Sequence, residues 1–191
     1  MSNLTNTYSE VINGIPIAGT ALNDTATGAI ISTAAQAGIL PIGFFNQYCV
    51  NKLIECTGII IVSTPASAPA TLQFEIGANT TLGTFAPAIV LATQTAFTPA
   101  VSLSSVPCIV NAFVTVQSIS GQSPQMVTWG TVSIGGASGA AGATYSFGSA
   151  TPVALTTGLN LQYGIELGAK WGTAVVSCTL TCEQWIVQGM N

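Results

Sequence analysis

Apolar and polar residues alternate most clearly near the C-terminus. In Leu159–Trp171 every second residue is apolar, and the residues between them are polar or glycine. This period of two is typical of a half-buried β-strand, whereas a helix repeats about every 3.6 residues. A turn is predicted at Gly172–Ala174, before a second alternating run, Val176–Val187. The two runs predict a β-hairpin on which the other strands assemble, and a change of parity at Cys182–Gln184 predicts a β-bulge.

Shorter strand-like runs recur upstream. The predicted strands are Phe44–Val50, Thr57–Ser63, Thr71–Ile76, Thr84–Leu91, Cys108–Ser118, Gln125–Ile134, Thr144–Phe147 and Pro152–Leu155. Leu72, Phe74 and Ile76 are predicted to face inward, and Cys108–Ser118 is predicted to form a hairpin with Gln125–Ile134. Regular short strands without a convincing long helix predict an all-β domain. Longer loops between several strands favour a single jelly-roll β-sandwich of about eight antiparallel strands over a meander.

The first forty residues differ from the rest. They are rich in Ala, Thr, Gly, Asn and Ile, without a clear strand or helix period. We therefore predict an extended N-terminal arm over residues 1–40 and a jelly-roll domain over residues 41–191. The arm is predicted to be the docking element, with Ile12, Ile15, Ile17, Ile30 and Ile31 lying along a neighbour. Trp129 and Trp171 are predicted to lie in the core, and Trp185, on the polar parity, is predicted to anchor a subunit contact.

Composition narrows the possible functions. The chain has 191 residues, which suits one domain, and 49% of them are hydrophobic but only 4% charged, against roughly 25% charged in an average soluble domain. Lys52 and Lys170 are the only basic residues, so the cationic footprint that a nucleic-acid-binding protein needs is missing. No apolar run approaches the roughly 18 residues of a membrane-spanning helix. A surface this poor in charge favours self-association or cover by a partner.

The five cysteines indicate buried, reduced thiols. They are Cys49, Cys56, Cys108, Cys178 and Cys182. The N-terminus has neither the basic start nor the apolar core of a signal peptide, so an odd number of cysteines argues against a disulfide framework. Cys178 and Cys182 would be about 13 Å apart on one strand, too far for a disulfide. Without a Cys-x-x-Cys pair or any histidine, neither a metal site nor a cofactor is predicted.

Several short strings, taken in their order, resemble a known class of protein. They are Ile39–Pro41 before an aromatic pair, Ile54–Ser63 (ending in TGIIIVS), Leu72–Gly77, Phe113–Val116 with Val127–Gly130, Leu159–Leu167, Lys170–Ala174 and a closing strand. This order resembles single jelly-roll structural proteins of tailed-phage virions, which serve as capsid decoration (cement) proteins or in tail appendages. The five cysteines and the near absence of charge depart from that class.

The resemblance implies a non-enzymatic protein without catalytic residues. It implies a homotrimer made in the host cytoplasm and bound to the shell of major capsid protein, on the outer surface of the virion. The alternative is a receptor- or glycan-binding head of a tail fibre with the same fold. A secreted trimeric ligand of the tumour-necrosis-factor or C1q type is a weaker alternative, because no signal peptide is predicted.

Enzymatic interpretations find little support in the sequence. Glu166 and Glu183 lie on the two strands of the predicted C-terminal hairpin and could form the carboxylate pair of a glycosidase. The sequence shows no aromatic-lined cleft around them, so carboxylates at the surface or at an interface are the simpler interpretation. A cysteine nucleophile would lack a histidine base. The string GGASGAAG lacks the lysine and the following helix of a phosphate-binding loop.

Overall fold

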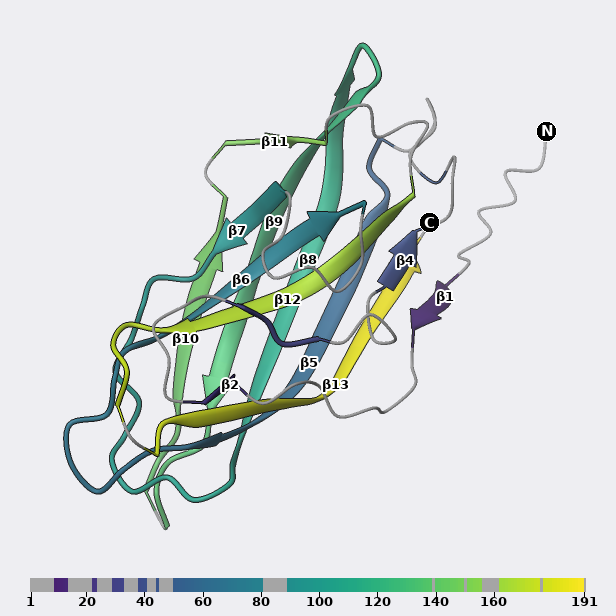
Figure 1. Cartoon of the computed structure of the whole chain (residues 1–191). Coiled ribbons are helices and arrows are strands. Elements are labelled where there is room, and N and C mark those ends of the chain that lie inside the picture. The colour runs from purple at the N-terminus through teal and green to yellow at the C-terminus, as the bar shows by residue number, and fades with distance from the viewer. Residues whose placement is uncertain are drawn as a thin grey trace.

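The computed structural model describes most of the chain. The described residues are 9–13, 22–23, 29–32, 38–40, 44, 50–80, 89–138, 140–149, 151–155, 162–175 and 177–190. All regular structure within them is β-strand. The strands form two antiparallel sheets stacked face to face, and the strands of one sheet cross those of the other at an angle (Figure 1). The predicted all-β sandwich is thus confirmed.

The larger sheet, sheet A, has eight strands in the order β1-β13-β5-β8-β9-β10, with β2 beside β13 and β11 beside β9. Their bounds are Ser9–Asn13 (β1), Leu22–Asn23 (β2), Leu53–Ser63 (β5), Val106–Ser120 (β8), Ser123–Ile134 (β9), Ala143–Gly148 (β10), Val153–Ala154 (β11) and Thr179–Met190 (β13). The predicted hairpin around residues 119–124 is confirmed as β8–β9. Its turn contains Gly121 at φ 62°, a left-handed conformation that favours glycine.

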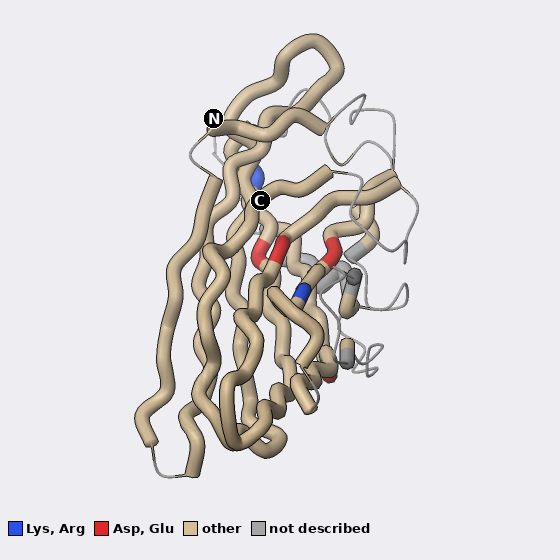
Figure 2. The backbone as a smooth tube through the Cα atoms, turned by 60° about the vertical axis from the view of Figure 1, so that its left-hand side comes forward, with Lys and Arg blue, Asp and Glu red and all other residues tan. Residues whose placement is uncertain are grey.

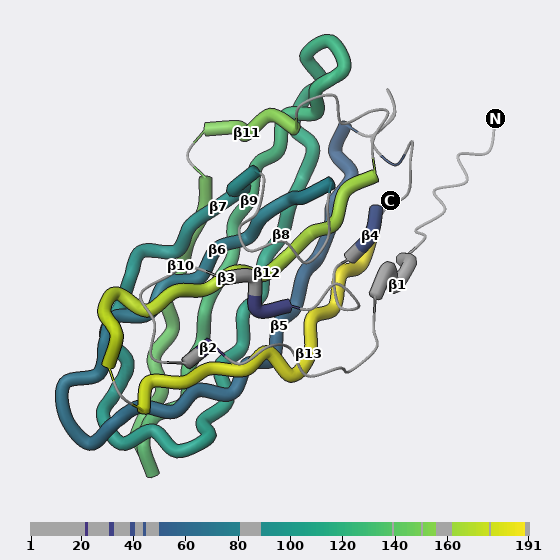
Figure 3. Tube along the Cα trace, viewed as in Figure 1, coloured from purple at the N-terminus to yellow at the C-terminus, as the bar shows by residue number. Residues whose placement is uncertain are grey.

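The smaller sheet, sheet B, has five strands in the order β3-β12-β6-β7, with β4 also beside β12. Their bounds are Ala29–Ile30 (β3), Gly38–Leu40 (β4), Leu72–Asn79 (β6), Ile89–Thr93 (β7) and Tyr163–Trp171 (β12). Strands β3 and β4 pair with β12, whereas β2 pairs with β13 in the other sheet. Figure 3 shows β12, β6 and β7 side by side in sheet B.

The path of the chain between the sheets is that of a jelly roll. It alternates from β1 in sheet A to β3 and β4 in sheet B, back to β5, over to β6 and β7, back to β8, and finally to β12 and β13. The resulting orders β1-β13-β5-β8 and β3-β12-β6-β7 are interleaved, as in a jelly roll. Strands β9 and β10 widen sheet A beyond this frame. The segment predicted as an arm supplies strands to both sheets.

The core lies between the two sheets and follows the alternation of the strands. Burial alternates along the whole of β5, and Leu72, Phe74 and Ile76 of β6 face inward as predicted. Trp171, predicted to lie in the core, is fully buried. Of the predicted strand Phe44–Val50, only the two end residues are among those described, and Thr84–Leu91 is described only from residue 89, where β7 begins.

The predicted C-terminal hairpin is wrong, although its two strands exist. Strand β12 pairs with β3, β4 and β6 in sheet B, whereas β13 pairs with β1, β2 and β5 in sheet A. Two strands that face each other across a core show the same alternation as two strands paired in one sheet, so the pattern did not distinguish the two arrangements. The predicted bulge is confirmed by the register shift between Cys182 and Gln184.

Candidate functional site

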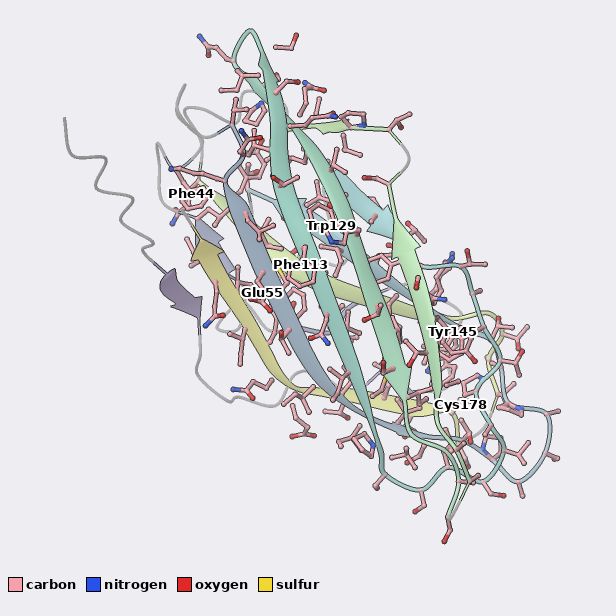
Figure 4. All side chains as sticks on the ribbon, turned by 180° about the vertical axis from the view of Figure 1, so that it is seen from behind. Phe44, Glu55, Phe113, Trp129, Tyr145 and Cys178 are labelled. Carbon is pink, nitrogen blue, oxygen red and sulfur yellow. The ribbon has the colours of Figure 1, made fainter. Side chains whose placement is uncertain are left out.

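The side of sheet A that faces away from the core is a broad surface, here called the outer face, seen from the front in Figure 4. The register of the strands aligns its side chains in rows that cross the sheet. One row, the aromatic row, runs over five neighbouring strands and consists of Gln188, Glu55, Phe113, Trp129 and Gly148. At about 4.8 Å between strands, this row is about 19 Å long.

Two aromatic rings form the centre of the aromatic row. Phe113 and Trp129 lie directly opposite each other on β8 and β9. Their ring centroids are 5.9 Å apart, with 23° between the ring planes. Trp129 is nevertheless 45% exposed. On its other flank the row continues with Gly148, which has no side chain to cover the indole. The pair therefore presents a large aromatic surface to solvent (Figure 4).

Trp129 was predicted to lie in the core, and this prediction is wrong. On β9 the buried positions are Pro124, Met126, Thr128, Gly130, Val132 and Ile134. Apolar residues occur on both parities of this strand, since Val127 and Trp129 alternate with Met126 and Val132. The pattern thus did not reveal which parity faces the core. Because the buried parity carries Thr128 and Gly130, the large side chain between them points outward.

A polar row lies beside the aromatic row, two residues further along each strand. It consists of Thr57, Asn111, Thr131 and Ser146, and the apolar Ile186 ends it on β13. The Thr57 Oγ1 hydroxyl donates to Asn111 Oδ1 over 3.1 Å. This bond fixes the orientation of the Asn111 amide and leaves its N–H groups directed elsewhere. At about 3.3 Å per residue, the two rows are separated by about 7 Å along the strands.

The outer face also carries an open hollow of about 410 Å³, here called the aliphatic hollow. Its described lining is Pro107, Ile109, Ser133, Ile134, Gly135, Gly142, Ala143 and Thr144. Ile109 is 41% exposed, and none of these lining side chains is ionisable. The Ser133 and Thr144 hydroxyls share a hydrogen bond of 3.0 Å. Ile109 lies four residues from Phe113 on β8, so the hollow is about 13 Å from the aromatic pair.

Charged residues are sparse on the whole fold (Figure 2). Glu55, opposite Phe113, is the ionisable residue of the aromatic row. Lys52, three residues before it, has its ammonium 4.8 Å from the centroid of the Phe44 ring and donates to the Phe44 carbonyl over 3.2 Å. The positive charge of Lys52 therefore lies beside Phe44, outside the two rows.

The two carboxylates considered for a glycosidase are not brought together on one hairpin. Glu166 is buried on β12 in sheet B, whereas Glu183 is exposed on β13 in sheet A. Within the described ranges, no group of three or more His, Cys, Asp or Glu residues is placed to hold a metal ion. The described chain also contains no helix long and apolar enough to cross a membrane.

The predicted interface residues lie mostly within the chain's own fold. Trp185 is fully buried, and its indole N–H donates to the Ile165 carbonyl over 2.9 Å. Its predicted role at a subunit contact is therefore wrong. The reason is the bulge after Cys182, which shifts the parity and turns Trp185 toward the core.

The isoleucines of the predicted arm have three different placements. Ile31 is fully buried, and its backbone N–H donates to the Leu167 carbonyl over 2.9 Å, so it belongs to the chain's own core and was wrongly assigned to a neighbour. Ile12 lies in β1, and Ile30 in β3 opposite Gly168. Ile15 and Ile17 lie outside the described residues.

The described cysteines are free thiols in the core, as predicted. They are Cys56, Cys108, Cys178 and Cys182, and Cys49 lies outside the described residues. Burial raises the pKa of Cys108 to about 12. Burial also raises the pKa of Cys182 to about 12, with a backbone hydrogen bond at Gln184 opposing the shift. The pKa of Cys56 is raised by burial and by the neighbouring charge of Glu55. Thiols held protonated in this way are poor nucleophiles.

Comparison with known proteins assigns no family. Neither a protein-family model nor a curated protein sequence matches the chain.

Several solved structures are similar to this chain at low sequence identity. A metal-free form of lectin I-B4 from Griffonia simplicifolia is 13% identical, with a TM-score of 0.41 over 96% of this chain and 99% of the lectin. The CBM2 module of the evolved Dit protein of Lactobacillus casei BL23 phage J-1 is 12% identical, with a TM-score of 0.34 over 99% of this chain and 93% of the module. An engineered GH43 glycoside hydrolase is 12% identical, with a TM-score of 0.33 over 98% of this chain but 41% of the enzyme. At these values the likenesses carry no conclusion about function.

Proposed function

We propose that this chain is a non-enzymatic structural protein of a tailed-phage particle, a decoration protein that binds the shell of major capsid protein from outside. The observation that carries the proposal is the outer face of sheet A, which carries little charge. It exposes Ile109 and Trp129 on strands whose remaining outward residues are mostly hydroxyls, amides and aliphatics. A contiguous surface with exposed apolar residues and little charge is typical of a protein that works in contact with a partner. The sequence resemblance to phage jelly-roll proteins supports the same class.

The aliphatic hollow is the part of the outer face that best fits a protein partner. It combines an exposed aliphatic side chain, Ile109, with a described lining free of ionisable groups. An apolar side chain of a shell subunit that entered the hollow would displace water from it. No charged group of the described lining would lose its hydration in the process. We place the contact with the shell at this hollow rather than at the arm, because the described arm strands pair with the chain's own sheets.

A binding assay on capsids tests this proposal. Heads assembled without this protein are incubated with the purified chain, sedimented, and the bound fraction is measured against protein concentration. Ile109→Glu, which places a charge in the hollow, is expected to weaken binding at least about tenfold. Trp129→Ala, a truncation of similar exposure about 13 Å away, is expected to leave shell binding unchanged. Equal binding by wild type and Ile109→Glu would refute the hollow as the contact, and no binding by wild type would refute the decoration role.

A second candidate function is a glycan-binding head of a tail appendage, and a specific observation favours it. The aromatic row presents exposed rings beside planar hydrogen-bonding side chains, which the aliphatic hollow does not. The two functions differ in stoichiometry. Quantitative mass spectrometry of purified particles should find a decoration protein at a copy number comparable to that of the capsid subunit, and a fibre head at only a handful per particle.

A further inference from the structure

We propose that the aromatic row, together with the polar row beside it, is a binding platform for a neutral glycan. This inference rests on the second candidate function and deepens it, since it assigns the site and the chemical class of the ligand. The platform comprises the Phe113–Trp129 pair, Glu55 and Gln188 on one side of it, and Asn111 in the polar row.

The aromatic pair supplies the apolar half of such a site. One face of a pyranose ring carries C–H groups, which pack on an aromatic ring through dispersion and the hydrophobic effect. Trp129 is 45% exposed while it stacks on Phe113. Its position is fixed by the strand register and by Phe113, and the neighbouring Gly148 leaves it accessible from the side. A ring that is held rigidly before binding loses little conformational entropy on binding.

Polar side chains at the edges of the pair supply the other half. Glu55 accepts hydrogen bonds through two oxygens, and the amides of Gln188 and Asn111 both donate and accept. Sugar hydroxyls are also donors and acceptors, and neighbouring hydroxyls on one ring match such planar groups. The Asn111 amide is already oriented by Thr57. A few placed polar groups around an apolar surface are typical of small-molecule and saccharide sites.

The charge of the platform favours neutral over anionic ligands. Glu55 is the ionisable residue of the aromatic row, and the ammonium of Lys52 is held at the ring of Phe44. An anionic glycan or a nucleic acid would meet a carboxylate without a cation in either row to offset the repulsion. The row is about 19 Å long, spanning five strands, so it offers space for several sugar residues side by side.

The inference is tested by calorimetric titration with named polysaccharides. The neutral probes are dextran, yeast mannan, galactan and mixed-linkage β-glucan, and polygalacturonate is the anionic control. At least one neutral probe is expected to bind, while polygalacturonate does not. Trp129→Ala is expected to weaken binding at least about tenfold, Trp129→Phe to retain most of it, and Glu55→Gln to weaken it several-fold. Ile109→Glu, on the same face but in the hollow, is the matched control and should bind as wild type does.

Fluorescence gives an independent readout. Trp171 and Trp185 are fully buried, so quenching by acrylamide reports mainly on Trp129. A bound neutral glycan should protect this fluorescence, and polygalacturonate should not. Failure of all four neutral probes, or equal binding of polygalacturonate, would overturn the inference. If Trp129→Ala bound glycan as wild type does, this site would be wrong, but the second candidate function, a glycan-binding head, would stand. Capsid binding by the same variants tests the decoration role separately.

Discussion

At the residue scale, Gly130 shows how closely the strands and side chains of sheet A approach each other. It faces the core on β9, opposite Phe147 of β10. A Cβ atom there would lie 2.2 Å from the Asn111 carbonyl oxygen and 2.7 Å from Cζ of Phe147. The carbonyl belongs to the β8–β9 ladder, so it cannot rotate away as a side chain could. Any larger residue at this position must therefore distort the sheet.

Gly130→Ala is accordingly expected to lower the free energy of unfolding by about 1–3 kcal/mol, the usual cost of overpacking. Urea denaturation monitored by tryptophan fluorescence measures it. Thr131→Ala, one residue along on the outer face, is the control and should stay close to wild type. A Gly130→Ala protein with the wild-type midpoint would show that β9 can shift at little cost.

The buried thiols make a second prediction at this scale. Because burial raises the pKa of Cys108 and Cys182 to about 12, the reactive thiolate is almost absent at about pH 8. Iodoacetamide should leave Cys56, Cys108 and Cys182 unmodified in the native protein and modify them once guanidinium chloride has unfolded it. Peptide mass spectrometry locates the modified residues. Rapid native modification of Cys108 would contradict its burial, and a pair that stays unmodified after unfolding would indicate a disulfide.

The same thiols predict how stability depends on pH. Their folded pKa is raised above the ordinary value of 9.0, so the folded state binds protons that the unfolded state releases. The stabilisation is complete below about pH 9 and is lost as the pH rises toward 12. The free energy of unfolding from urea titrations should therefore fall between these values. Replacing Cys108 with Ala should reduce the slope of this fall, and an unchanged slope would assign the alkaline loss to other groups.

At the scale of elements, the contact between β12 and β13 joins the two sheets rather than two strands of one hairpin. The Trp185 indole on β13 donates to the Ile165 carbonyl on β12 over 2.9 Å. On its own sheet, Trp185 lies opposite Gly58 of β5. A Cβ at Gly58 would be 3.2 Å from Cε3 of Trp185 and 2.9 Å from Cδ2 of Leu167. Gly58 thus provides the space into which the indole packs.

Trp185→Ala is expected to cost about 3–5 kcal/mol, because it removes a large buried side chain and leaves a cavity. Trp185→Phe should cost less, since the ring remains and mainly the hydrogen bond to Ile165 is lost. Trp129→Ala is the matched control and should cost about 1 kcal/mol, the worth of an exposed aromatic pair. Urea denaturation compares the three variants. Similar losses from Trp185→Ala and Trp129→Ala would mean that Trp185 does not join the sheets.

The elements themselves were largely predictable from the sequence, but their pairing was not. Alternation or strand-length apolar runs located β5, β6, β8, β9, β12 and β13, and the bulge in β13 followed from its parity change. Pairing depends on contacts between distant residues, which the local period of a strand does not encode. For the same reason the aromatic row was missed, because it joins residues from five strands. The one signal for the exposed side of β9 was the pair of small residues Thr128 and Gly130 on its buried side.

At the scale of the whole molecule, the N-terminal segment completes the jelly roll. Strands β1 to β4 have two to five residues each and pair with β12 or β13. Strands this short leave almost no periodic signal in the sequence, which explains why they were predicted only as an extended arm. Their pairing gives a physical reason to expect that removing residues 1–40 exposes edges of both sheets, since β12 and β13 would lose partners.

We predict the oligomeric state from the low charge of the chain and from the apolar side chains on its surface. Only 4% of the residues are charged and the formal net charge is −4, so electrostatic repulsion does little to keep copies apart. The described surface also exposes Val50, Val90 and Val101, which belong neither to the aliphatic hollow nor to the aromatic row. Closed cyclic symmetry covers such surfaces without forming a fibre, and the sequence resemblance points to three copies. We therefore expect a homotrimer with three times the 19.3 kDa mass of one chain.

Sedimentation velocity at micromolar concentration measures this mass directly. Because the trimer is expected to be held by apolar rather than ionic contacts, it should persist when the salt is raised to about 1 M, where the Debye length falls to about 3 Å. Burial of apolar surface would even be strengthened by sulfate. A stable monomer would refute the trimer, and a trimer that dissociates in high salt would mean that the few charged residues hold it together after all.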